Sequence, residues 1–67
     1  MGKLLEYCTD LLDENGQLDE SFDFNSLEDA KKKYDELHAT EMSGLFVQIW
    51  HRESEDNPVC LLGSEIV

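Results

Sequence analysis

The most regular pattern of apolar positions lies in the middle of the chain. Apolar side chains recur there at spacings of three and four residues: Leu27, Ala30, Tyr34 and Leu37. This spacing predicts a helix with one apolar stripe. Ser26 stands directly before the stripe and suits the N-cap position, where its hydroxyl can accept a backbone N–H. The sequence therefore predicts a helix over residues 27–38.

The C-terminal part carries two apolar runs separated by a polar segment. Residues 45–52 are rich in β-branched and aromatic side chains, and residues 59–67 in branched aliphatic ones. Such runs are typical of strands. The intervening residues 53–58 are acidic and end in Pro58, which favours a turn. A β-hairpin is expected here.

The N-terminal third permits two interpretations. Apolar residues between positions 4 and 14 fit one face of a helix that would end at Asn15 and Gly16. The same residues can instead form a strand, with Asn15 and Gly16 as a two-residue type I′ turn. Residues 18–24 alternate between apolar and polar side chains and therefore read as a strand. We favour the hairpin because it gives this strand a partner for its backbone groups.

These elements together predict an α+β fold. The expected order is β-β-α-β-β, two hairpins joined by one helix that packs on one face of a small antiparallel sheet. The alternative is α-β-α-β-β with an N-terminal helix. Residues 1–67 are expected to form a single small domain, because a chain of this length has room for one modest core.

The net charge of the chain indicates which classes of partner it can bind. Sixteen acidic residues stand against five Lys and Arg, for a net charge of -11. Repulsion from phosphates disfavours direct binding to nucleic acid or to anionic membranes. The charge favours a basic protein surface. A high net charge also keeps a small protein soluble, and this is the simpler explanation of its acidity.

Cys8 and Cys60 are far apart in the sequence and lack the spacing of a metal site. The chain begins without a signal-peptide pattern, and its longest uncharged run, residues 42–51, is too short to span a bilayer. We therefore expect a cytoplasmic protein, of the host cell if the source is a phage, with two buried and reduced thiols.

No residue pattern predicts catalysis, a metal or a cofactor. His38 and His51 have no nucleophile placed beside them by the sequence, so we interpret both as structural. The four glycines are isolated and form no phosphate-binding loop, and the acids lack the register of a calcium loop. We expect a protein that is not an enzyme.

The strand over residues 45–52 is apolar on both faces, and one helix covers one face. If Leu45, Val47 and Ile49 face the helix, Phe46, Trp50 and Arg52 face away, and aromatic and Arg side chains are enriched at interface centres. The opposite orientation remains open, because alternation alone cannot choose between two apolar faces. The first orientation predicts an interface centred on Phe46 and Trp50, with Arg52 beside them.

Acidic residues near both hairpins would form the rim of that interface. They are Asp19, Glu20, Asp23, Glu53, Glu55 and Asp56. In size, charge and lack of catalytic motifs the chain is similar to small bacteriophage inhibitors, including anti-CRISPR proteins and DNA mimics. No motif carries this similarity, which covers composition and organisation only. It implies an inhibitor that occupies a basic, nucleic-acid-handling surface. The alternative is a structural subunit that homodimerises through its open sheet face or an edge strand.

Overall fold

The computed structural model describes residues 5–52 and 57–67. Along the chain it contains four strands and one helix: β1 (Tyr7–Leu12), β2 (Leu18–Phe24), α1 (Leu27–Thr40), β3 (Phe46–Arg52) and β4 (Pro58–Glu65). The predicted order β-β-α-β-β is confirmed. The alternative with an N-terminal helix is wrong, because the segment from Tyr7 to Leu12 pairs as a strand.

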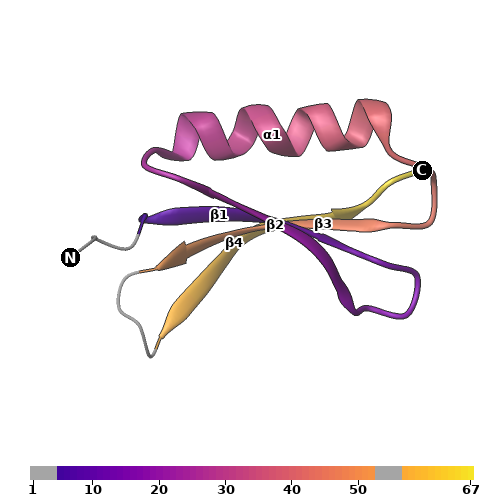
Figure 1. Ribbon diagram of the computed structural model, residues 1–67, viewed down its shortest axis with the longest axis horizontal. Helices are drawn as coiled ribbons and strands as arrows, with labels where there is room; N and C mark the ends of the chain where they lie inside the picture. Colours follow the sequence, from indigo (N-terminus) through magenta and orange to yellow (C-terminus); the bar gives the residue numbers. More distant parts are fainter. Residues whose placement is uncertain (1–4, 53–56) are drawn as a thin grey trace.

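The strands form one antiparallel sheet in the order β2-β1-β3-β4. The two hairpins therefore meet through β1 and β3, with β2 and β4 at the edges. Helix α1 crosses one face of this sheet (Figure 1) and contacts β1, β2 and β3. The opposite face carries no element of the described chain and is called the open face below.

The core lies between α1 and the two central strands. Leu11 of β1, Val47 of β3, Leu37 of α1 and Ile66 form its buried cluster. Ala30 is fully buried, and its carbonyl accepts a hydrogen bond from the buried Thr9 hydroxyl at 2.9 Å. The small alanine lets the helix approach the sheet closely enough for this bond.

The predicted helix start is confirmed, and the helix ends two residues later than expected, at Thr40 rather than residue 38. Ser26 is the N-cap, and its hydroxyl accepts from the Asp29 N–H at 3.2 Å. Within the described residues no helix has both the length and the apolarity needed to cross a membrane.

The N-terminal hairpin is confirmed, but the predicted type I′ turn is wrong. That turn needs positive φ at both central residues, whereas among the non-glycine residues of the described chain none has positive φ. The turn closes one residue earlier, where the Gly16 N–H donates to the Asp13 carbonyl at 3.0 Å. The Asp13 carboxylate also accepts from the N–H groups of Asn15 and Gln17, which stabilises this longer loop. Gly16 alone takes the left-handed conformation in the loop, at φ 84°.

Candidate protein-binding face

The open face is defined by the strand register. Residues directly opposite in an antiparallel sheet point to the same side. Trp50 of β3 lies opposite Cys8 of β1 and Cys60 of β4. Repeating this alternation along the strands gives the residues of the open face: Cys8, Asp10, Leu12, Leu18, Ser21, Asp23, Phe46, Gln48, Trp50, Arg52, Pro58, Cys60, Gly63 and Glu65.

Strand β3 resolves which of its two apolar faces is buried. Val47 and Ile49 are fully buried beneath α1, and Leu45 packs against the same core. Phe46 and Trp50 alternate with them and remain partly exposed. The orientation with the aromatic residues facing away from the helix is therefore the one the structure adopts.

Both aromatic rings contact neighbouring residues on the open face. The Trp50 indole N–H donates to the Gln48 side-chain oxygen at 3.1 Å. The Phe46 ring lies over Gly63 of β4, close enough that a Cβ on this glycine would meet it at 3.2 Å. Phe46 and Trp50 thus form a partly exposed aromatic pair with contacts inside the sheet, and side chains already held by such contacts lose less conformational entropy when a partner binds.

Arg52 lies on the open face as predicted, but its guanidinium already has partners. It contacts the Asp23 carboxylate at 3.0 Å and donates to the Leu5 carbonyl at 3.2 Å. The pair reaches from β3 across β1 to β2. Arg52 therefore links β3 to β2 and partly neutralises the negative charge of Asp23, which lies near the aromatic pair.

Only some of the acidic residues predicted to form the rim are found on the open face. Asp23 lies on the open face, whereas Glu20 is paired with Leu11 and lies on the helix side. Asp19 has no opposite residue in β1, because the strand register shifts between Leu11 and Leu12, and its side chain is exposed. Glu53, Glu55 and Asp56 lie outside the described residues.

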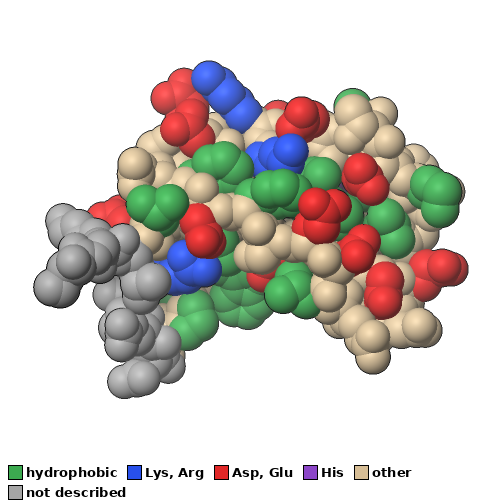
Figure 2. Space-filling view, viewed as in Figure 1, with side chains coloured by type: hydrophobic (Ala, Val, Ile, Leu, Met, Phe, Trp, Pro, Cys, Tyr) green, Lys and Arg blue, Asp and Glu red, His purple; other side chains and the backbone are tan. Residues whose placement is uncertain are grey.

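Two acids that sequence reasoning missed belong to the open face. Asp10 lies opposite Gln48 and accepts a hydrogen bond from Ser21 at 2.6 Å, and the exposed Glu65 lies opposite Phe46. Only the cross-strand register reveals these positions. Figure 2 shows acidic side chains scattered among apolar ones on the side it displays, with Lys and Arg side chains in isolated places.

A hollow of about 350 Å³ opens beside Phe46 at one end of the open face. Its lining combines apolar surface with three acids and contains no lysine or arginine: Leu12, Asp13, Glu14, Gly16, Gly44, Phe46, Gln48 and Glu65. Acids beside apolar surface suit the charged head and the aliphatic stem of a lysine or arginine side chain.

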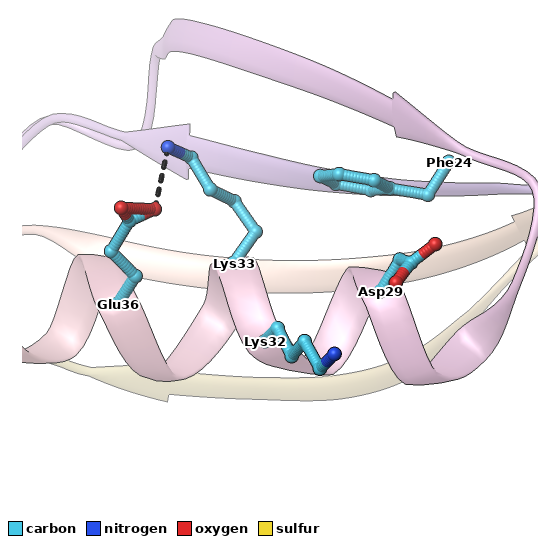
Figure 3. A pocket seen from close by; sticks show the side chains of 5 residues that line it. All are labelled: Phe24, Asp29, Lys32, Lys33 and Glu36. Atoms are coloured by element: carbon cyan, nitrogen blue, oxygen red, sulfur yellow. Dashed lines mark hydrogen bonds and ion pairs between the residues drawn. The ribbon is translucent and has the colours of Figure 1, made fainter.

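A second hollow, of about 520 Å³, lies between α1 and β2 (Figure 3). Its charges balance, because Lys32 and Lys33 line it together with Asp29 and Glu36. Lys33 is bound to Glu36 at 2.8 Å and lies 4.4 Å from the centre of the Phe22 ring. This hollow therefore favours neither anions nor cations.

The two thiols differ in environment, so the expectation of two buried cysteines is half wrong. Cys8 is buried and Cys60 is exposed, and both are free. Strand β3 separates them, with Trp50 in between. Burial and the neighbouring Asp10 carboxylate raise the pKa of the Cys8 thiol to about 11.

Alkylation should distinguish these thiols. Because the thiolate is the reactive form, Cys8 should react with iodoacetamide at least about tenfold more slowly than Cys60 at pH 8. Its rate should keep rising about tenfold per pH unit up to pH 10, below the raised pKa. Peptide mass mapping over time measures both rates, and equal rates in denaturant serve as the control. Equal rates in the native protein would contradict the buried position of Cys8.

His38 takes part in a side-chain network that the sequence did not reveal. Its Nδ1 lies 2.9 Å from the Tyr34 carbonyl and its Nε2 lies 2.8 Å from the Ser64 hydroxyl. The Tyr34 hydroxyl also contacts Ser64. The hydroxyl and imidazole resemble a nucleophile and base, but neither hollow described above includes them. The network joins α1 to the edge strand β4.

Two remaining features bear on the site: the arrangement of possible metal-ligating side chains and the similarity of the chain to known proteins. In the part of the chain that the structure describes, no three His, Cys, Asp or Glu side chains converge in a way that could hold a metal ion. Comparisons with protein-family models, with curated proteins and with solved structures find no match to this chain.

Proposed function

We propose that this chain is a non-enzymatic, acidic protein-binding module that acts in the cytoplasm. Its open face occupies a basic, nucleic-acid-binding surface of a partner protein and so inhibits it. The observation that carries the proposal is the combination on one face of a partly exposed aromatic pair, Phe46 and Trp50, with an acidic hollow whose lining contains no basic side chain. Aromatic anchors supply binding energy, and complementary charge supplies orientation and speed of association.

Charge supports a basic partner specifically. The net charge is -11, and the open face adds Asp10 and Glu65 around the aromatic pair. The one arginine on this face is engaged by Asp23, so it contributes little free positive charge. A lysine or arginine of the partner would enter the hollow beside Phe46, with apolar surface of the partner on Trp50.

A designed peptide provides a defined probe. We choose a helix of about 18 residues, roughly 27 Å long, with a leucine stripe flanked by lysines. A scrambled peptide of the same composition, without the stripe, is the control. Fluorescence anisotropy of labelled peptide should show at least about tenfold tighter binding of the striped peptide. Binding should weaken with salt, because exposed charges are screened.

Two outcomes would reject the proposal. Equal binding of both peptides would mean that charge alone attracts them, as it does on any solvated acidic surface. No binding of either peptide at low salt would mean that the aromatic pair and the acidic hollow do not form a site for basic helices.

A further inference from the structure

The two edges of the sheet differ sharply in charge. Edge strand β2 carries Asp19, Glu20 and Asp23, and such acids prevent the edge from pairing with another copy. Edge strand β4 carries no charge from Pro58 to Ser64. In the described part of the chain no strand follows β4 in the sheet. The backbone groups on its outer side are therefore available for pairing.

Strand β4 also exposes apolar side chains. Val59, Leu61 and Leu62 are each 40% exposed. Helix α1 lies over the other three strands and reaches β4 through hydrogen bonds to Ser64. Pro58 and the register shift at Leu61 make this edge less regular. An apolar and uncharged edge is nevertheless unusual in a soluble fold unless another strand covers it.

The β4 edge is complementary to the same edge of a second copy, because antiparallel pairing brings the uncharged stretch from Pro58 to Ser64 against itself. Two chains of charge -11 repel each other over most of their surface, and the uncharged stretch of β4 is where they can approach. Antiparallel pairing about the middle of β4 places Glu65 of each copy opposite the start of β4 in the other. The two Glu65 side chains are then about 23 Å apart along the strands, well beyond the screening length of about 8 Å in physiological salt.

We propose that two copies pair through β4 into one continuous eight-stranded antiparallel sheet. The pairing is isologous, so it uses both β4 edges and closes at the dimer. The outer edges are then the two acidic β2 strands, which block further growth. An antiparallel edge pair relates the copies by an axis perpendicular to the sheet, so both helices lie on one side. The two open faces form one surface of twice the length.

Sedimentation velocity of the purified chain tests the pairing directly. Over about a hundredfold range of protein concentration, a monomer–dimer equilibrium without larger species is expected. Leu61→Glu introduces a charge on β4 and should raise the dimer dissociation constant at least tenfold. Leu18→Glu is the matched control, because Leu18 is 61% exposed on the opposite edge. It should leave the dissociation constant within about twofold of the wild type.

Circular dichroism checks that each variant is folded, and Val59→Lys replaces Leu61→Glu if the latter unfolds. A positive charge at β4 should weaken the dimer as well, although it lowers the net negative charge. The proposal is wrong if the wild-type chain remains monomeric over the whole range in about 0.15 M and 1 M salt. It is equally wrong if the β4 and Leu18 variants weaken the dimer alike.

Discussion

Trp50→Ala should weaken binding of the striped basic peptide about 30-fold, or about 2 kcal/mol, while the protein stays folded. Trp50 lies at the middle of the open face between Cys8 and Cys60 and is only partly buried. Its removal therefore takes away the contact expected to anchor the partner, and the core between α1 and the sheet is not touched. Anisotropy with labelled peptide measures the affinity, and thermal denaturation measures the stability.

Tyr7→Ala is the matched control for Trp50→Ala. Tyr7 is a partly buried aromatic residue on the helix side of β1, where it stacks on His51 at 4.7 Å between ring centres. This variant should lose stability and retain peptide affinity within about twofold. If Trp50→Ala instead lowers the free energy of unfolding by about 3–5 kcal/mol, Trp50 belongs to the core. The open face would then not be a binding face.

Gly16→Val should lower the free energy of unfolding by about 2–3 kcal/mol, through backbone conformation alone. Gly16 has φ 84°, where β-branched residues are genuine outliers. A Cβ built at this position meets no atom within 4 Å, so a clash of the Cβ with neighbouring residues does not cause the loss. Chemical denaturation of the purified variants measures the change.

Gly16→Asn separates conformation from other effects at the same position. Asparagine tolerates the left-handed region better than other non-glycine residues, so this variant should recover at least half of the stability that valine loses. Equal losses for both variants would contradict the turn geometry. Strand-type chemical shifts over Tyr7–Leu12 in the wild-type chain check the hairpin independently.

Local sequence signals predicted the elements well. The apolar stripe and Ser26 located the helix, because capping and periodicity depend on neighbours in sequence. The alternation around Trp50 placed Phe46 and Trp50 on one face of β3. The sequence pattern left open which face of β3 is buried, because both faces are apolar. The packing of Val47 and Ile49 beneath α1 decides it.

Which residues share the open face depends on the register and order of the strands, and local sequence patterns do not predict these pairings. Asp10 and Glu65 join the open face because of cross-strand register, and Glu20 leaves it for the same reason. Cys60 is exposed because β4 is an edge strand, a consequence of strand order. The guanidinium of Arg52 is occupied because Asp23 lies across β1 from it.

The most direct test of the central claim is to map the bound peptide on the protein by NMR. Titration of the striped basic peptide into the isotope-labelled chain should shift the Trp50 indole N–H and the Gln48 side-chain amide most strongly, since both lie on the open face. Signals of exposed residues on the outer side of α1, such as Lys31 and Asp35, should change little. Shifts concentrated on α1, or spread evenly over all acidic residues, would contradict the account.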